Sequence, residues 1–225
     1  CLTREDNYTM KTNILVVMIC LAVILTGCEG MNRMQKGALG GAAAGAAAGA
    51  LVSDNIWGVL LGAAVGGAAG AAIGKHMDEQ AKELEQAVPT SEVQRVGEGI
   101  NMTFASGLMF NINSATLQES YKDDLRAAAS VFEKYGDTNI LVEGHTDDTG
   151  TDELNMNLSR QRADNVAKFL AENGVDRTRL QTKAFGETQP KYPNDSEDNR
   201  SRNRRVELAI FANDDMVASA ESGSL

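Results

Sequence analysis

The chain has 225 residues, and its 31 acidic residues outnumber its 21 basic residues, so the formal net charge at pH 7 is −10. A chain with this charge repels the phosphates of nucleic acid, which we therefore exclude as a partner. Only two histidines are present and all three cysteines lie within the first 28 residues, so a metal site would need mostly carboxylates. We predict neither a metal nor a cofactor.

The first 27 residues are predicted to be a signal peptide, with translation starting at Met10. Lys11 precedes an apolar run, Ile14 to Leu25. That run is shorter than the roughly 20 apolar residues of a membrane-spanning helix, which favours a cleaved signal. Small residues follow the run, as expected before a cleavage site.

The signal ends in Leu-Thr-Gly-Cys, with the cysteine at Cys28. This ending resembles the lipobox at which bacterial lipoproteins are cleaved and acylated, for example with palmitate. The alternative is an ordinary signal peptide with a chance cysteine. We expect residues 28–36 to form a lipidated N-terminus. Glu29 follows the cysteine where an inner-membrane retention signal would have Asp, so we expect a lipid anchor in the outer membrane and a domain facing the periplasm.

Residues 37–75 are predicted to form a helical hairpin, because glycine recurs at every fourth position in two runs separated by a polar break. Such a stripe lies on one helix face and lets another helix approach closely. The segment resembles the glycine zippers of envelope lipoproteins, and a flexible Gly/Ala linker is the alternative. The glycines of the two runs are Gly37, Gly41, Gly45 and Gly49, then Gly58, Gly62, Gly66, Gly70 and Gly74.

Charged residues dominate the next segment, and residues 76–90 are predicted to be an exposed helical linker that ends at Pro89. A small hairpin is then expected, with strands at Val93–Val96 and Ile100–Phe104 on either side of a Gly-Glu-Gly turn. At the other end of the chain, residues 213–225 are expected to be a flexible tail.

A folded domain is predicted over residues 91–212. Apolar runs and alternation predict strands, and helical spacing of apolar residues predicts two helices, the second ending at Asn173-Gly174. The resulting order, β-α-β-α-β-β, predicts an α+β fold, a two-layer α/β sandwich with helices on one sheet face. The predicted elements are strands at Leu108–Ile112, Ile140–Val142, Leu180–Phe185 and Val206–Phe211, and helices over Tyr121–Tyr135 and Leu154–Leu170.

Three motifs of this region point to one family. They are GHTDDTGTDELNMNLSRQRA from Gly144 to Ala163, NRRVE from Asn203 to Glu207, and FNINSATL from Phe110 to Leu117. Together they resemble the OmpA-like peptidoglycan-binding domain, over roughly Val93 to Phe211, and FNINSATL matches the opening strand of that family.

The resemblance implies non-covalent binding of peptidoglycan through the diaminopimelate of its stem peptide. In the family an Asp takes the ammonium of that residue and an Arg takes its carboxylate, and the matching residues here are Asp147 and Arg162. Arginine suits a carboxylate, because its planar guanidinium can donate two parallel hydrogen bonds. The other candidate ligand-binding residues are Asn155 and Leu158 on the helix face of Arg162, Thr149 and Gly150 in the loop, and Asn203 and Arg204 at the rim. The alternative is that Asp147 and Arg162 form a structural ion pair.

One residue departs from the family pattern. Asn199 stands where the family usually has glycine, before the NRRVE motif. Glycine suggests a left-handed backbone there, and asparagine tolerates that conformation best among the other residues. We therefore expect the loop to keep its shape.

Three functions from different classes follow. The first is an outer-membrane lipoprotein that tethers the membrane to peptidoglycan. The second is a membrane-associated, oligomer-forming or assembly-related protein in which the glycine zipper is the active part. The third is a peptidoglycan-cleaving enzyme with His145 and Asp147 as a catalytic pair. We favour the first and predict no enzyme, because no nucleophile with a base and no second paired acid is apparent.

Overall fold

The computed structural model describes residues 67–105, 109–111 and 113–225. The predicted signal peptide, Cys28 and most of the predicted glycine zipper lie outside these residues. Within the part of the chain that is described, no helix is both long and apolar enough to cross a membrane.

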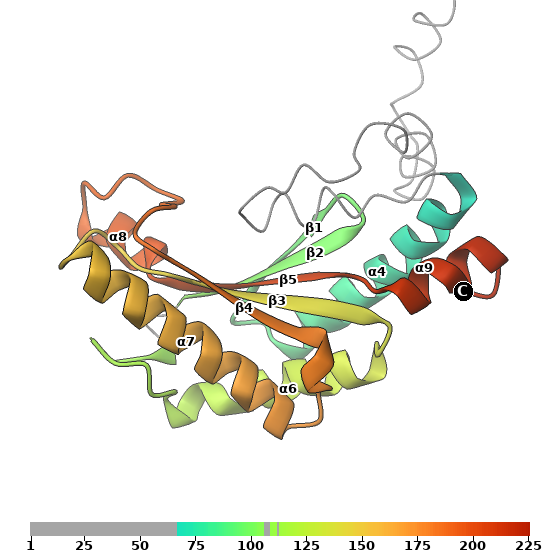
Figure 1. Cartoon of the computed structure of the whole chain (residues 1–225), viewed down its shortest axis with the longest axis horizontal. Coiled ribbons are helices and arrows are strands. Elements are labelled where there is room, and N and C mark those ends of the chain that lie inside the picture. The colour runs from blue at the N-terminus through green and yellow to red at the C-terminus, as the bar shows by residue number, and fades with distance from the viewer. Residues whose placement is uncertain (1–66, 106–108, 112) are drawn as a thin grey trace, which may run out of the picture.

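A five-stranded sheet forms the centre of the molecule, in the order β1-β2-β5-β3-β4 (Figure 1). Its strands are β1 (Glu92–Val96), β2 (Gly99–Ala105), β3 (Thr138–His145), β4 (Leu180–Gly186) and β5 (Arg205–Ala212). Only β3 and β4 pair in parallel, and the other neighbours are antiparallel. The predicted α+β class is confirmed, as are the strands predicted for β3, β4 and β5.

Side-chain alternation along the strands separates two faces of the sheet. Val142 and Leu208 point into the main apolar core, which also contains residues of all the long helices. Leu141 and Ala209 belong to a small cluster on the other face. The helices therefore cover one face, as predicted for a two-layer fold.

Helices α6 (Glu119–Lys134) and α7 (Asp152–Glu172) were both expected from their apolar spacing. In α7 the Thr151 hydroxyl accepts a hydrogen bond from the Leu154 N–H and caps the start of the helix. At the other end, Gly174 follows the Asn173 cap with a φ of 102°, which a side chain would disfavour. The predicted end of this helix is confirmed.

The strand predicted at Leu108–Ile112 is wrong over its described residues. Met109 is helical, and Phe110 forms only an isolated bridge to Leu117. Asn113 has a φ of +54°, so the chain folds back, and the Gln118 N–H donates to the Met109 carbonyl. Phe110 therefore joins the main apolar core from this closed loop and not from a strand of the sheet. The first two strands are instead those of the hairpin, since β2 pairs with β5.

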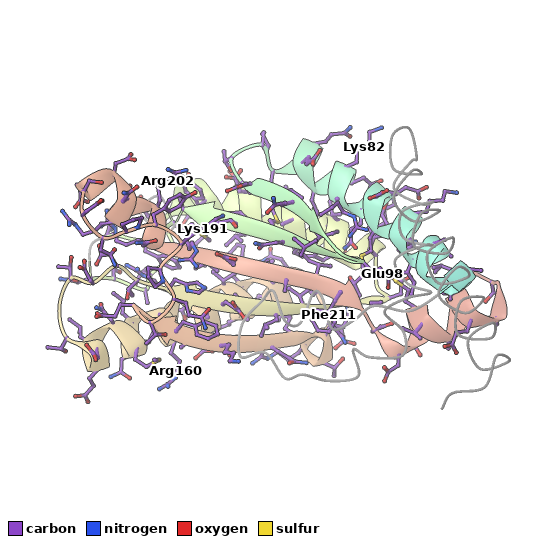
Figure 2. The ribbon with its side chains drawn as sticks, turned by 90° about the horizontal axis from the view of Figure 1, so that it is seen from above. Lys82, Glu98, Arg160, Lys191, Arg202 and Phe211 are labelled. Carbon is purple, nitrogen blue, oxygen red and sulfur yellow. The ribbon has the colours of Figure 1, made fainter. Side chains whose placement is uncertain are left out.

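The prediction of an exposed linker helix over residues 76–90 is also wrong. Helix α4 (Gly67–Ala87) buries Ile73, Met77 and Leu84 completely in the main core. These residues repeat at helical spacing and share one face, whereas Lys82 points to solvent (Figure 2). Midway along the helix, the His76 ring nitrogen lies 3.2 Å from an Asp137 carboxylate oxygen, which ties α4 to the loop before β3.

The predicted flexible tail contains a helix, α9 (Asp214–Ser222), and that prediction is wrong as well. The Asn213 side chain caps its start by accepting from the Met216 N–H. Met216 and Ala220 are buried, and α9 packs against α4. The helix that precedes residues 91–212 in the chain and the helix that follows them therefore complete the core of the domain.

Two short elements remain. A 3₁₀ turn, η1 (Arg177–Arg179), leads into β4, and helix α8 (Glu197–Asn203) precedes β5. The Arg179 guanidinium donates to the carbonyls of Phe132 and Tyr135 at the end of α6, 2.8 Å in each case. It thereby satisfies carbonyls that the helix leaves without an internal partner.

Candidate functional site

The site is built where β3 and α7 touch through their backbones. A β-carbon placed on Gly144 of β3 would lie 2.1 Å from the Ser159 carbonyl oxygen of α7. On β4 the Gly186 N–H donates to the Ser159 hydroxyl at 3.0 Å. Asp147 follows β3 and Arg162 lies on the same helix as Ser159, so this contact fixes where the acid and the base stand relative to each other.

A pocket of about 470 Å³ opens beside this contact, within the size range usual for small-molecule sites. Most of the residues predicted for the site line its wall: Asp147, Thr149, Asn155, Leu158, Arg162 and Arg204. The structure therefore brings together an acid, a base and an apolar side chain, as a site for a small zwitterion requires.

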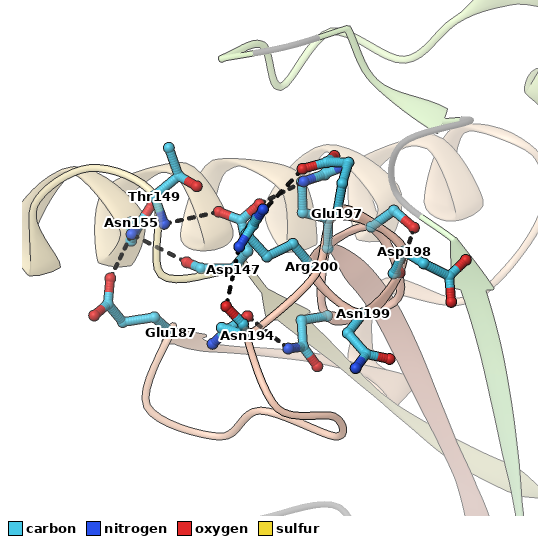
Figure 3. Close-up of polar contacts among 12 residues, drawn as sticks. Asp147, Thr149, Asn155, Glu187, Asn194, Glu197, Asp198, Asn199 and Arg200 are labelled. Atoms are coloured by element: carbon cyan, nitrogen blue, oxygen red, sulfur yellow. Dashed lines mark hydrogen bonds and ion pairs between the residues drawn. The ribbon is translucent and has the colours of Figure 1, made fainter.

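Asp147 is almost fully buried and carries two hydrogen bonds. The Thr149 N–H donates to one carboxylate oxygen at 2.9 Å (Figure 3). The Arg204 guanidinium donates to the other. Burial on its own raises the pKa of Asp147, but the bonds from Arg204 and Thr149 outweigh it and hold the pKa below its ordinary value. Asp147 is therefore a carboxylate at neutral pH.

Arg162 is a buried cation in the same pocket wall. Its Nε donates to the Ser114 carbonyl at 3.0 Å, and its guanidinium carbon lies 5.1 Å from the centre of the Phe110 ring. Burial, followed by the nearby charge of Arg204, lowers the pKa of Arg162 to about 10. A carboxylate bound here would relieve both effects.

Asn155 holds the loops of the site together. Its side-chain nitrogen donates to the Asp147 carbonyl at 3.2 Å and also to the Glu187 carboxylate (Figure 3). Asn155 also lines the pocket. The residue predicted to orient a ligand therefore has a second role, which is to fix the backbone of Asp147.

Two predicted residues do not line the pocket. Gly150 has a φ of 111° and shapes the loop before α7. Asn203 is fully buried and uses its side chain on the backbone of the loop before α8: its oxygen accepts from the N–H groups of Lys191 and Tyr192, both at 2.9 Å. The structure thus places Asn203 behind the site, not at its rim.

The expectation for Asn199 was wrong. Asn199 lies in the first turn of α8, and its N–H donates to the Ser196 hydroxyl that caps the helix. Among the described residues other than glycine, only Asn113 has a positive φ. A helix, not a left-handed turn, therefore occupies this position.

His145 turns away from the pocket. Its ring stacks on Phe185 with centroids 5.3 Å apart, and its Nε2 lies 3.7 Å from a Glu143 oxygen. Burial first, and the charge of Arg205 second, lower its pKa well below the ordinary 6.5. The structure does not bring His145 and Asp147 together as a catalytic pair. Within the described residues, no cluster of three or more His, Cys, Asp or Glu side chains could hold a metal ion.

Sequence reasoning missed several residues of the wall, which are Phe110, Asn111, Asn113, Thr146 and Glu197. The first three belong to the motif that was taken for a strand, so their wrong secondary structure hid their position. Glu197 comes from a different segment, and no local pattern marks it. Its only signal is its place six residues before the NRRVE motif.

Two family models match the chain. Residues 109–204 match the OmpA family, and residues 10–78 match the YMGG-like Gly-zipper. The first match contains the whole pocket wall, and the second covers the glycine runs and the start of α4.

Curated relatives match about half of the chain. Probable lipoprotein YiaD of Escherichia coli (strain K12) is 38% identical over 118 residues, which cover 52% of this chain and 54% of YiaD. The peptidoglycan-associated lipoprotein of Legionella pneumophila is 31% identical over 104 residues, 46% of this chain and 59% of that protein. The chain thus spans little more than half the length of either relative.

Solved structures share the fold. The cell wall anchor of the T6SS from Pseudomonas aeruginosa gives a TM-score of 0.54 at 26% identity, covering 61% of this chain and 97% of that one. A structure of the periplasmic domain of Helicobacter pylori MotB gives 0.52 at 27% identity, covering 62% and 90%. The sheet and its helices are therefore an arrangement also found in a cell wall anchor and in a periplasmic domain.

Proposed function

We propose that this chain, whose residues 109–204 form a domain of the OmpA family, binds peptidoglycan non-covalently through the diaminopimelate of the stem peptide. The observation that carries the proposal is the presence of Asp147 and Arg162 on the wall of one pocket. The names of two relatives, a peptidoglycan-associated lipoprotein and a cell wall anchor, support the wall as the partner.

In the proposed complex the ligand ammonium lies against Asp147 and its carboxylate against Arg162. The Phe110 ring supports the guanidinium from one side, and Leu158 contributes apolar wall beside it. A charged hydrogen bond in a buried site is roughly twice as strong as a neutral one, so the two ionic contacts dominate the affinity. We propose no catalytic step.

The test compares sacculus binding by Asp147→Ala and Arg162→Ala with binding by the parent. Each change leaves one charge of the ligand unpaired in the pocket, which costs about 2 to 5 kcal/mol, or roughly 30-fold or more in affinity. Arg160→Ala is the matched control, since Arg160 lies on the same helix but is exposed and outside the pocket wall (Figure 2).

A modified ligand sharpens the test. Amidating the carboxylate of diaminopimelate should weaken binding to the parent and barely affect Arg162→Ala, because that variant has already lost the partner. If both single variants keep the parent's circular dichroism and still bind sacculi like the parent, the proposal is wrong. Loss of binding that accompanies unfolding would instead support the structural ion pair.

We also propose that the chain is an outer-membrane lipoprotein, with Cys28 acylated and the domain facing the periplasm. The similarity to YiaD and to outer membrane proteins supports an envelope location. More than one acyl chain makes a stable anchor, whereas a single chain binds only marginally. Mass spectrometry of the membrane-bound mature protein should show the lipid mass on Cys28, and an unmodified thiol would refute the anchor.

A second candidate function is self-assembly through the glycine zipper, favoured by the match of residues 10–78 to a zipper family. Gly45→Leu and Gly66→Leu should then change oligomer size in detergent, since a bulky side chain cannot occupy a glycine crossing. Sacculus binding should stay the same. Unchanged oligomer size in both variants would return the segment to the linker interpretation.

A further inference from the structure

The pocket already contains a cation that contacts Asp147. We propose that Arg204 is a resident counterion that the ligand ammonium displaces, and that Glu197 receives its guanidinium when it leaves. The inference deepens the proposed function and rests on it. It assigns Arg204 the role of a competitor, where the motif alone suggested a ligand contact at the rim.

The contacts show a bridge with two carboxylates. One terminal nitrogen of Arg204 donates to Asp147, and the other donates to a Glu197 oxygen at 2.7 Å. The Asp147 side chain is 7% exposed, the Arg204 side chain 28% and the Glu197 side chain 70%. Arg204 therefore spans from a buried acid to a solvated acid, and it can rotate toward the second without losing every ionic contact.

The charge of Asp147 explains why a counterion is needed. A buried carboxylate without a cation is strongly disfavoured, and the one backbone N–H from Thr149 supplies only part of the compensation. Arg204 supplies the rest while the pocket holds no ligand. An incoming ammonium exchanges one cation for another, so Asp147 stays compensated throughout, whereas a neutral group in the same place would not replace the charge.

The same exchange relieves the other side of the pocket. The charge of Arg204 disfavours the protonated form of Arg162, so the two guanidiniums repel each other. Movement of Arg204 toward Glu197, which is anionic, screens that repulsion as the ligand carboxylate reaches Arg162. Glu197 is thus a positioning residue that acts through Arg204.

A double-mutant cycle isolates this linkage. The variants are Glu197→Gln, Arg204→Gln and the pair together, and the probe is meso-diaminopimelate titrated by calorimetry. In the parent background, Glu197→Gln should weaken binding about threefold to fivefold. This loss corresponds to the free energy of one exposed ion pair, about 1 kcal/mol. In the Arg204→Gln background the same change should have no effect, since the Arg204 guanidinium is gone and the other cation paired with Glu197, Arg200, does not line the pocket.

Arg204→Gln by itself should bind the probe at least as tightly as the parent, because no resident cation has to leave. Arg202→Gln is the matched control, as it makes the same change two residues earlier, in the last turn of α8 and outside the pocket wall. Arg204→Lys restores a cation and should restore part of the Glu197→Gln effect, which guards against a folding defect in the glutamine variant.

Each outcome decides the inference. If Arg204→Gln weakens binding more than threefold, Arg204 contacts the ligand and the inference is overturned. If Glu197→Gln weakens binding equally in both backgrounds, its negative charge only stabilises the first turn of α8, and the inference is again overturned. If the parent itself fails to bind the probe, the proposed function falls instead, together with what rests on it.

Discussion

Replacing Gly144 with alanine tests the contact on which the whole site depends. The added methyl group would lie 2.1 Å from the Ser159 carbonyl oxygen and 2.8 Å from its carbonyl carbon, where ordinary contact begins at 3.4 Å. Both atoms belong to the backbone of α7, so neither can rotate away. The helix or the strand must move by about 1.3 Å, judged from the shortfall to the oxygen.

The expected cost follows from this overlap. Overpacked sites with movable side chains lose about 1 to 3 kcal/mol, and a backbone that must shift places Gly144→Ala at or above the upper end. Urea unfolding followed by circular dichroism measures the free energy of unfolding directly, provided that the slope with urea stays the same. A movement of this size also separates Asp147 from Arg162. The affinity for meso-diaminopimelate should therefore fall by about tenfold or more, and a tenfold loss corresponds to about 1.4 kcal/mol of binding free energy.

Gly74→Ala is the matched control. A β-carbon at Gly74, inside α4, meets no atom within 4 Å. Alanine is favoured over glycine inside a helix by about 1 kcal/mol, so this variant should be more stable than the parent. The two substitutions are chemically identical and have opposite predicted signs. If Gly144→Ala unfolds at the same urea concentration as the parent, the close approach of β3 and α7 is not what fixes the site.

Two further predictions concern the rest of the domain. Leu84→Ala should lower the free energy of unfolding by about 2 to 5 kcal/mol, because Leu84 is fully buried, whereas a change within about 0.5 kcal/mol in urea unfolding would mean that α4 is the solvated linker after all. For His145, the folded-state pKa lies well below the unfolded value of 6.5, so the unfolded state binds the proton more readily and stability is lost as the pH falls below 6.5. The parent should lose about 1.4 kcal/mol between pH 7.5 and 5.5 from this residue, and urea unfolding of His145→Asn should lack that loss; an equal loss in the variant would assign the pH dependence to another group.

The sequence predicts the part of the site that one continuous segment builds. All five residues lie in the loop that follows β3 or in the adjacent helix α7: Asp147, Thr149, Asn155, Leu158 and Arg162. Their spacing is local, because helix periodicity and the strand end place them before any tertiary contact is considered. These residues line the pocket as expected.

The features of the site and the fold that the sequence did not predict depend on contacts between segments far apart in the chain. The ion pair of Asp147 and Arg204 joins residues 57 positions apart, and no periodicity encodes it. Helix α4 was taken for a solvated linker because charged residues separate Met77 and Leu84. Those apolar positions do repeat at helical spacing, yet one partner of the helix, α9, lies near the end of the chain. Burial of an amphipathic helix is therefore decided by partners that a local pattern does not contain.

The ends of the molecule have a mechanical consequence. Figure 1 shows α8 and the start of α7, which border the pocket, at one end of the long axis, and the start of α4 with α9 at the other. If the wall holds the first end and a lipid anchor pulls on Gly67, the load runs along α4. Ile73, Met77 and Leu84 lie in a row on that helix, all buried in the core. In that case a pull along the row would shear these contacts together instead of peeling them one at a time, so a domain that tethers as proposed would resist tension between its two ends.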